Sequence, residues 1–378
     1  MPETSIAIDM RCVRPGATGV GRSVAQLAAH MAAAAPQRRF CLLALRGADL
    51  GALAKLANVE MVRVPFDMTQ HPGNEWWLNA RLRPLLGALG ADLYHGPAFH
   101  APWRDPGVPV VVTVHDLTVF ESRTYYSARF RYYMQWMIRL AVRRASRVVA
   151  VSEAVRQALL KRLGLAPARV AVVPHGAPPG LEPPAPAERV RAFREQLGLP
   201  ERYILSIGAL EPRKNAIGLA RAVARIPQSE RPLLVWAGAE GRRSRAIHES
   251  MLRLLGPDGL RWLSRIDDAD LALLRCGAAA LAGPSFSEGF GLPILEAMAG
   301  GLPVVCSDIP AHREVAGDSA LFADPSDPQS WAERLIAIQT DAALRTRLAE
   351  AGRRRASQWR WEDSARRMLD IYDDLTGA

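Results

Sequence analysis

The sequence predicts an α/β protein made of two Rossmann-like, doubly wound domains. Short apolar runs alternate with helical stretches through the chain, and one proline-rich segment interrupts this rhythm near the middle. The length of 378 residues is more than one hydrophobic core usually holds. Apolar residues form 49% of the chain and charged residues 23%, a balance that excludes a wholly disordered protein.

The first half contains runs of strand length that are rich in apolar and β-branched residues. Several of them are apolar almost throughout, as parallel strands buried on both faces are. Helical spacing of apolar residues separates them, for example in residues 24–35 and 75–89. The alternation predicts a parallel sheet that binds ligands at the carboxyl ends of its strands. The expected strands are residues 6–9, 40–45, 59–65, 91–96, 108–114, 146–152 and 170–174.

Residues 176–188 read GAPPGLEPPAPAE and contain five prolines. Proline fixes φ and lacks an N–H, so this segment predicts a stiff linker rather than a helix or central strand. The first domain is therefore expected to span residues 1–175.

After the linker the same rhythm restarts and predicts a second domain over residues 189–357, facing the first across a cleft. A helix is expected over residues 189–197, closed by Gly198 and Pro200. The amphipathic stretch 361–375 predicts a terminal helix that must cover an apolar surface. The expected strands of the second domain are residues 203–207, 233–237, 260–266, 278–282, 303–307 and 320–323.

Several classes of protein are disfavoured by composition and by missing signals. There is no run of about eighteen apolar residues that could span a bilayer, and the first twelve residues lack the pattern of a signal peptide. The four cysteines, Cys12, Cys41, Cys276 and Cys306, form no CxxC pair, which favours a reduced, cytoplasmic protein without a structural metal. The net charge of +10 suits a nucleic acid, an anionic membrane or phosphorylated substrates.

The most informative segment is residues 284–308, PSFSEGFGLPILEAMAGGLPVVCSD. It predicts a strand, a glycine loop and a helix, so that backbone amides and the positive end of the helix face a ligand. Glu288 lies in the loop, where it can accept hydrogen bonds from ligand hydroxyls. Glu296, eight residues later, lies about one turn into the helix, where a carboxylate suits a ribose diol.

A second segment, residues 206–215, reads SIGALEPRKN. It predicts a strand end, then Gly208, and then the cations Arg213 and Lys214. A diphosphate requires compensating positive charge, which Arg and Lys supply in different geometries.

Together these segments resemble the retaining nucleotide-sugar glycosyltransferases of the GT-B fold, family 4, and in particular bacterial mannosyltransferases of polysaccharide biosynthesis. The resemblance implies that the second domain binds the donor, the first binds the acceptor, and a C-terminal helix, residues 358–378, returns to the first domain. Many relatives carry an Arg directly after the glycine of the second segment, where this chain has Ala209.

The resemblance also implies roles for individual residues of the second domain. Glu288 is expected to contact the donor sugar, Glu296 the ribose, and Arg213 and Lys214 the diphosphate. The backbone at Arg265 and Ile266 is expected to meet the nucleobase. The other expected donor-binding residues are Gly208, Gly289, Phe290, Gly291 and Leu292.

In the first domain, the resemblance implies that Gly19 and Gly21 of the sequence GATGVG form a loop over the diphosphate and acceptor. His115 and Asp116 end the strand VPVVVTVHD, where ligands of a doubly wound sheet bind. His115 is expected beside the reacting end of the donor sugar, with Asp116 next to it. His175, where relatives often have Asn, is a further candidate for ligand contact.

No metal and no cofactor are expected beyond the nucleotide-sugar substrate. Asp268 and Asp270 formally match the metal-binding DxD pattern of another glycosyltransferase fold. However, Asp at a helix start caps free N–H groups and suits the helix dipole, so we interpret this pair as a cap.

Residues 121–147 contain seven arginines interleaved with tyrosines and one tryptophan, against a single acid, Glu121. A basic amphipathic helix with aromatics can lie on an anionic bilayer. The same composition fits a nucleic-acid patch or simply an exposed helix. No nucleic-acid motif accompanies it, so we expect no nucleic-acid partner and consider a location at the inner face of the cytoplasmic membrane.

The predicted function is transfer of a sugar, mannose from GDP-mannose as the best candidate, to a hydroxyl of a glycan or lipid-linked glycan, with retention. A UDP-sugar donor is the alternative within the family. An NAD-dependent oxidoreductase would need GxGxxG directly after a strand and an acid about twenty residues later, which the chain lacks. A nucleic-acid-binding protein would explain the charge but not the Glu288–Glu296 segment.

Overall fold

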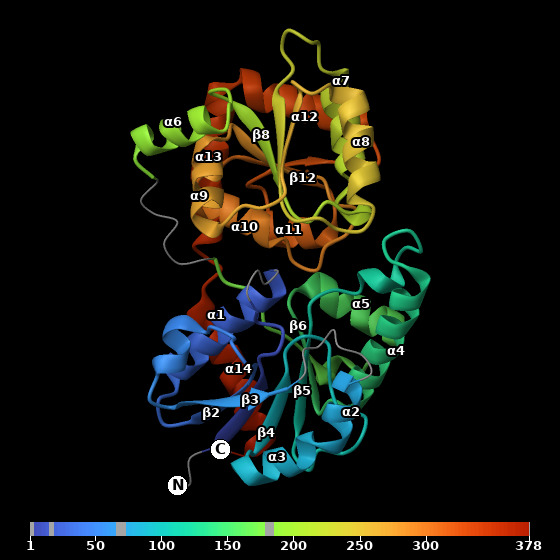
Figure 1. Ribbon diagram of the computed structural model, residues 1–378, viewed down its shortest axis with the longest axis vertical. Coiled ribbons are helices and arrows are strands. Elements are labelled where there is room, and N and C mark those ends of the chain that lie inside the picture. The colour runs from blue at the N-terminus through green and yellow to red at the C-terminus, as the bar shows by residue number, and fades with distance from the viewer. Residues whose placement is uncertain (1–3, 15–18, 66–72, 178–184, 378) are drawn as a thin grey trace. The chain divides into compact units, whose positions relative to one another are not determined.

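The computed structural model describes residues 4–14, 19–65, 73–177 and 185–377. The chain forms two compact units (Figure 1). The first comprises Met1–Glu121, Ala128–Gly176 and Arg360–Ala378, and the second comprises Ser122–Ser127 and Ala177–Trp359.

The first unit is built on a seven-stranded sheet in the order β3-β2-β1-β4-β5-β6-β7, in which every pairing is parallel. The strand order reverses between β1 and β4, which marks the ligand-binding edge of a doubly wound sheet. The strands are β1 (Ser5–Asp9), β2 (Arg39–Leu45), β3 (Val59–Val64), β4 (Leu93–Gly96), β5 (Val110–Val114), β6 (Arg147–Ala150) and β7 (Val170–Val172). The helices are α1 (Gly19–Ala34), α2 (Gly73–Ala80), α3 (Leu82–Leu89), α4 (Ala128–Arg144), α5 (Glu153–Leu163) and α14 (Trp361–Thr376).

The C-terminal helix α14 belongs to the core of the first unit, beside α1 (Figure 1). Its buried stripe, which includes Met368 and Tyr372, packs with residues of α1, β1 and β2. The Tyr372 hydroxyl is hydrogen-bonded to His95 Nδ1 at 2.7 Å, and His95 Nε2 to Thr113 Oγ1 at 2.8 Å. The predicted return of this helix to the first domain is therefore confirmed.

The second unit is built on a six-stranded parallel sheet in the order β10-β9-β8-β11-β12-β13. Its order reverses between β8 and β11. The strands are β8 (Tyr203–Ile207), β9 (Leu233–Ala237), β10 (Leu260–Leu263), β11 (Ala280–Gly283), β12 (Val304–Ser307) and β13 (Leu321–Ala323). The helices are α6 (Ala187–Gln196), α7 (Ala216–Arg225), α8 (Ser244–Leu255), α9 (Asp268–Gly277), α10 (Leu292–Ala299), α11 (Pro310–Ala316), α12 (Pro328–Thr340) and α13 (Ala342–Ala356).

The predicted fold class, with two Rossmann-like domains, is confirmed, and each predicted strand run overlaps a strand of the structure. Some bounds differ. The run 260–266 was too long, because β10 ends at Leu263, and the helical stretch 75–89 is two helices that meet at Arg81. Pro84 lies in the first turn of α3, where a missing N–H is tolerated.

Most of the predicted linker, residues 178–184, lies outside the described residues. Across the described part of the chain, no helix is long and apolar enough to cross a membrane. All four cysteines are free.

Tyr372→Phe removes the hydroxyl that joins α14 to β4 and leaves His95 Nδ1 buried without this partner. An unsatisfied buried polar group costs about 1–3 kcal/mol, so the free energy of unfolding should fall by that amount. Urea unfolding of the two proteins measures the difference. Tyr132→Phe, on an exposed side chain of α4, is the matched control and should change nothing. Equal stability of all three proteins would contradict the role of this hydrogen bond.

Candidate functional site

The candidate site of the second unit lies at the carboxyl ends of β8 and β11, which are neighbours in the sheet. A single turn, Pro212–Lys214, follows β8, and the loop 284–291 leads from β11 into α10. Gly208, at the end of β8, has φ +146°, a conformation that favours glycine. A Cβ there would lie 3.2 Å from Lys214 Cε, so the lysine side chain packs directly over this glycine.

Glu288 is the centre of an ion cluster that joins these two loops. Its Oε2 accepts from Arg213 Nη1 at 2.8 Å, and its Oε1 accepts from Lys214 Nζ at 2.6 Å. The Ser285 hydroxyl donates to the same Oε1 at 2.7 Å. Arg213 also donates to Glu211 Oε1 at 2.9 Å and to the Ser287 carbonyl at 2.9 Å. The predicted catalytic residues Glu288, Arg213 and Lys214 are thus one connected group.

The charges of this cluster balance, because two cations face the two carboxylates of Glu211 and Glu288. The side chain of Glu288 is only 15% exposed. Burial alone would raise the pKa of Glu288, but Arg213 and Lys214 outweigh it and hold that pKa well below its ordinary value. The two cations are therefore already paired with carboxylates, whereas the sequence-based interpretation left them to a diphosphate alone.

The amino end of α10 borders the same site. Gly291, with φ +110°, caps the helix, and a Cβ there would lie 3.2 Å from the ring of His312. His312 is buried and hydrogen-bonded through Nδ1 to the Ser307 carbonyl at 3.1 Å. It lines a cavity together with Lys214, Ser285 and Glu288. Since a carbonyl accepts, Nδ1 carries the proton, which makes Nε2 of the neutral ring an acceptor.

Glu296, on the second turn of α10, is paired with Arg275 of α9. The two side chains are 13% and 9% exposed, so this pair is largely buried. The carboxylate that the sequence assigned to a ribose is therefore already held on one side by a guanidinium.

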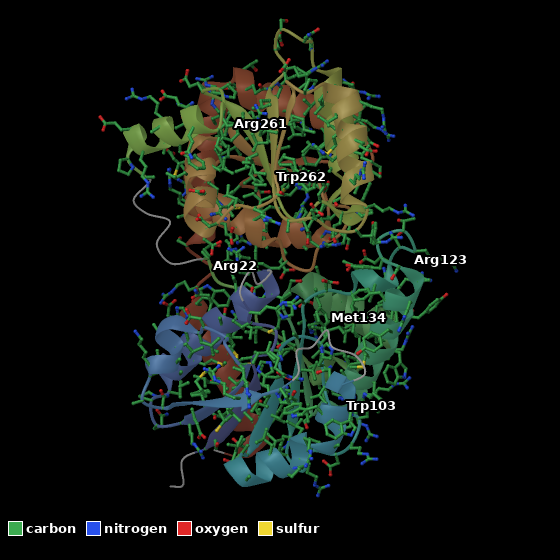
Figure 2. The ribbon with its side chains drawn as sticks, in the orientation of Figure 1. Arg22, Trp103, Arg123, Met134, Arg261 and Trp262 are labelled. Carbon is green, nitrogen blue, oxygen red and sulfur yellow. The ribbon has the colours of Figure 1, made fainter. Side chains whose placement is uncertain are left out.

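The other predicted donor-binding residues follow the same loops. Phe290 is buried and packs edge-to-face on Trp359, with ring centroids 5.4 Å apart. Gly289 precedes it in the loop, and Leu292 is the first residue of α10. Arg265 and Ile266 lie after the end of β10, between that strand and α9. In β10, the Trp262 indole donates to the Gly238 carbonyl at 3.0 Å (Figure 2).

The DxD-like residues Asp268 and Asp270 lie in the first turn of α9, as expected, but neither of them is the cap. Asp267 caps the helix by accepting from the backbone N–H of Asp270 at 2.8 Å, and Asp268 is the first helical residue. Among the described residues, no group of three or more His, Cys, Asp or Glu side chains is arranged to hold a metal ion.

The first unit brings His115 and His175 together. Their rings are stacked, with centroids 5.4 Å apart and planes 20° from parallel. His115 Nε2 donates to the Pro97 carbonyl at 2.7 Å, so its Nδ1 is the acceptor when the ring is neutral. Burial lowers the pKa of His115, and burial together with His115 lowers that of His175 well below its ordinary value. A small cavity beside the two rings is also lined by Thr113 and Met368.

One prediction for the first unit needs correction. Gly19 and Gly21 do not lie in a loop, because α1 begins at Gly19 and both belong to its first turn, where the Ser23 hydroxyl donates to the Gly19 carbonyl at 2.7 Å. The preceding residues 15–18 lie outside the described residues. Asp116 holds a local turn, since its Oδ1 accepts from the Thr118 N–H at 3.0 Å and from the Thr118 hydroxyl at 2.6 Å.

Sequence reasoning did not single out four residues of these sites: Ser285, Glu211, His312 and Arg275. The first two lie inside the motifs, where the spacing of Ser285 and Glu288 in one loop was a usable signal. His312 and Arg275 lie on α11 and α9, and no motif marks them, because only the packing of these helices brings them to the site.

Both halves of the chain match known families of glycosyltransferases. The family described as Glycosyl transferases group 1 matches residues 190–355, and Glycosyltransferase Family 4 matches residues 17–180. The chain belongs to this family of glycosyltransferases. Both matches favour this class over a dehydrogenase or a nucleic-acid-binding protein.

The chain is also similar to individual glycosyltransferases of known name. O-antigen chain mannosyltransferase B of Escherichia coli is 31% identical over 283 residues, 74% of each chain. The D-inositol 3-phosphate glycosyltransferase of Salinispora arenicola is 33% identical over 63% of this chain and 56% of its own length. Many of the curated relatives are thus matched over only about half of their length.

Solved structures share the fold over nearly the whole chain. Sucrose-phosphate synthase of Thermosynechococcus elongatus has a TM-score of 0.79 at 22% identity and covers 99% of this chain and 100% of its own. WaaG, a glycosyltransferase of lipopolysaccharide biosynthesis, has a TM-score of 0.75 at 20% identity, with coverage of 99% and 100%. These likenesses show that the chain has the GT-B architecture.

Buried neutral histidines predict a loss of stability in mild acid. Burial lowers the pKa of His95 to about 3 and that of His312 to about 4. As pH falls below about 6.5 the unfolded chain takes up protons that the folded chain does not, so the free energy of unfolding falls. Between pH 7 and pH 5 each histidine should remove about 2 kcal/mol.

Urea unfolding at the two pH values measures this loss, and His312→Gln should show a smaller one than the wild-type protein. A free energy of unfolding that is unchanged or higher at pH 5 would contradict neutral burial of these rings.

The ion cluster predicts that substitutions of Glu288 and of Lys214 have different effects on the binding of a nucleoside diphosphate. Glu288→Gln leaves Arg213 and Lys214 less compensated, so a nucleoside diphosphate should bind at least as tightly, while sugar transfer falls at least about tenfold. Lys214→Ala should weaken that binding by about ten- to hundredfold, the value of a charge-assisted contact. Calorimetric titration gives both affinities. If Glu288→Gln weakens diphosphate binding as much as Lys214→Ala does, the shared-cation arrangement is wrong.

Proposed function

We propose that the protein is a retaining glycosyltransferase that takes a hexose from a nucleotide-diphosphate donor and transfers it to a hydroxyl of a glycan or lipid-linked glycan. The observation that carries the proposal is the ion cluster of Glu288, Arg213 and Lys214 at the amino end of α10. It combines an acceptor for sugar hydroxyls with cations and a helix end for a diphosphate.

The proposed reaction is a displacement on one face of the sugar. The bond between the anomeric carbon and the phosphate oxygen breaks, the bond to the acceptor oxygen forms, and the departing phosphate takes the acceptor proton. Arg213, Lys214 and the amino end of α10 stabilise the negative charge that develops on the leaving diphosphate. Because these groups supply positive charge, we propose that no metal ion is required.

We assign donor binding to the second unit and acceptor binding to the first. In the second unit Glu288 would accept from the sugar hydroxyls, Glu296 from the ribose, and the backbone near Arg265 and Ile266 would meet the base. In the first unit Nδ1 of the neutral His115 is available as an acceptor beside His175, which suits a sugar hydroxyl.

Mannose from GDP-mannose is the proposed donor, and bacterial surface polysaccharide the proposed product. Two of the similar proteins are O-antigen chain mannosyltransferases, from Escherichia coli and Salmonella typhimurium, which supports this choice. A UDP-sugar is the second candidate, favoured by the likeness to Anabaena HepE, which was solved with UDP and glucose at 20% identity and a TM-score of 0.76.

Thermal shift with GDP, UDP, ADP and TDP tests the donor, because a ligand that binds only the folded state raises its stability. At a GDP concentration of about 100 times Kd the stabilisation should be about 2.7 kcal/mol. Incubation with GDP-mannose and a polyprenyl-diphosphate-linked glycan should then give an α-mannoside, with the configuration of the donor, equally well in EDTA.

If UDP alone stabilises the protein, the donor is a UDP-sugar and not GDP-mannose. A β-linked product would overturn retention, and loss of activity in EDTA that Mg²⁺ restores would overturn metal independence. If none of the four nucleotides stabilises the protein, the proposed function itself fails.

We further propose that α4 docks the enzyme on an anionic membrane, at the inner face of the cytoplasmic membrane. Its outward stripe, Arg129, Tyr132, Trp136, Arg139 and Arg143, recurs every three or four residues and is exposed. Met137, Ile138, Ala141 and Val142 form its buried face.

The rest of the basic segment 121–147 adds fewer exposed cations to the proposed membrane-docking surface than its composition predicted. Helix α4 covers only residues 128–144, and Arg147 is paired with Asp374 of α14. Trp136 packs edge-to-face on Trp103, with ring centroids 5.1 Å apart, which places a second aromatic ring beside the helix. Trp103 is labelled in Figure 2. Amphipathic rings beside cations suit the headgroup level of a bilayer.

Sedimentation with vesicles containing phosphatidylglycerol tests the docking. Wild-type protein should sediment at low salt and be largely released at high salt, since each basic residue near such a surface contributes about 1 kcal/mol that salt screens. Replacement of Arg129, Arg139 and Arg143 by Gln should abolish most of the binding. A charge-matched control carries Gln at Arg221, Arg225 and Arg245, which are exposed on α7 and α8, and should sediment as the wild type. Equal sedimentation of the two triple variants would contradict docking through α4.

A further inference from the structure

The ion pair between Arg275 and Glu296 joins two helices of the second unit. Arg275 lies in the last turn of α9, and its Nη2 donates to Glu296 Oε2 on α10. With exposures of 9% and 13%, both side chains have lost most of their hydration. A buried charge without a partner is strongly unfavourable, so each residue requires the other.

The end of α9 is a fixed base for Arg275. Leu271, Leu273 and Leu274 are buried, and the Tyr203 hydroxyl of β8 donates to the Leu274 carbonyl at 2.7 Å. The guanidinium is therefore presented to α10 from a packed helix end rather than from a loop. Nε of Arg275 is buried with no hydrogen-bond partner among the described residues, so its charge-assisted contact is concentrated on Glu296.

We propose that Arg275 is a positioning residue that orients the Glu296 carboxylate to accept from a ribose diol. This inference rests on the proposed function, in which Glu296 contacts the ribose of the donor nucleotide. A carboxylate has two oxygens and about four lone-pair sites, and one guanidinium bond occupies only part of that capacity. Two adjacent ribose hydroxyls present two donors, which the remaining lone pairs can accept.

The orientation of the Glu296 carboxylate matters for binding, because the last torsion angle of a glutamate side chain has a broad distribution. A carboxylate free to rotate must be ordered when the ligand binds, whereas one held by Arg275 is ordered beforehand, and pre-organisation increases affinity. Arg275 would thus confer a preference for ribonucleotides over nucleotides without the diol. An ion pair that only fastens α9 to α10 would confer no such preference.

The experiment compares the affinity for GDP with that for 2′,3′-dideoxy-GDP by calorimetry, with UDP and its dideoxy analogue measured in parallel. Wild-type protein should bind the ribonucleotide at least about tenfold more tightly, as expected when charge-assisted hydrogen bonds are lost. In Arg275→Met this ratio should fall towards one, mainly through weaker ribonucleotide binding. Arg275→Lys keeps the charge but not the planar fork, so an intermediate ratio is expected.

Two further variants sharpen the comparison. Glu296→Gln should lower the ratio as Arg275→Met does, and the double variant should be no lower than Glu296→Gln, because residues that act as one unit are not additive. Arg313→Met is the matched control, since Arg313 forms an exposed pair with Asp308 in the same unit. It should keep the wild-type ratio.

The outcomes separate the inference from the function on which it rests. A folded Arg275→Met protein with the wild-type ratio overturns the inference and leaves nucleotide binding intact. If that variant does not fold, a wild-type ratio in Arg275→Lys together with a lowered one in Glu296→Gln overturns it equally. Wild-type protein that binds no ribonucleotide at all overturns the proposed function and the inference together.

Discussion

The ion cluster around Glu288 is the interaction that holds the candidate site of the second unit together. Three donors, Arg213, Lys214 and Ser285, converge on its carboxylate from two loops at adjacent strand ends. Because the cluster is mostly removed from water, it balances its own charges and holds Glu288 ionised. A ligand that carries both hydroxyls and a diphosphate can replace parts of this network on both sides, which a simple anion cannot do. The cluster thus joins a basic loop and an acidic loop at one place.

The candidate site of the first unit is uncharged, unlike the ion cluster of the second. Its two stacked imidazoles, His115 and His175, are kept neutral by burial, and the Pro97 carbonyl fixes the tautomer of His115. Neutral rings accept or donate single hydrogen bonds and carry no charge that would compete for the diphosphate. The candidate site of the second unit is thus built from charged side chains, and that of the first unit from two neutral rings.

Much of the fold could be predicted from sequence, because parallel strands buried on both faces leave nearly continuous apolar runs. Strand ends were less accurate, as β10 shows, because no glycine or proline follows Leu263 to mark the end of the strand. Within the site, Glu288, Arg213 and Lys214 could be found because glycines and charges cluster in two short motifs. Their mutual pairing could not, since it depends on which strands are neighbours. Arg275 and His312 could not be predicted for the same reason. Each lies on a helix whose own sequence does not indicate which side chains of other elements it will contact. Gly19 and Gly21 were misplaced because glycine composition indicates a loop, whereas the backbone there is already helical.

We propose that a nucleotide diphosphate-sugar binds at the cluster around Glu288. The most direct measurement is a crystal structure of the protein soaked with GDP-mannose. We expect phosphate oxygens within hydrogen-bond distance of Lys214 Nζ and of the first amides of α10, with the sugar hydroxyls on Glu288. A nucleotide bound elsewhere on the molecule, with the Glu288 cluster closed as it is here, would contradict it.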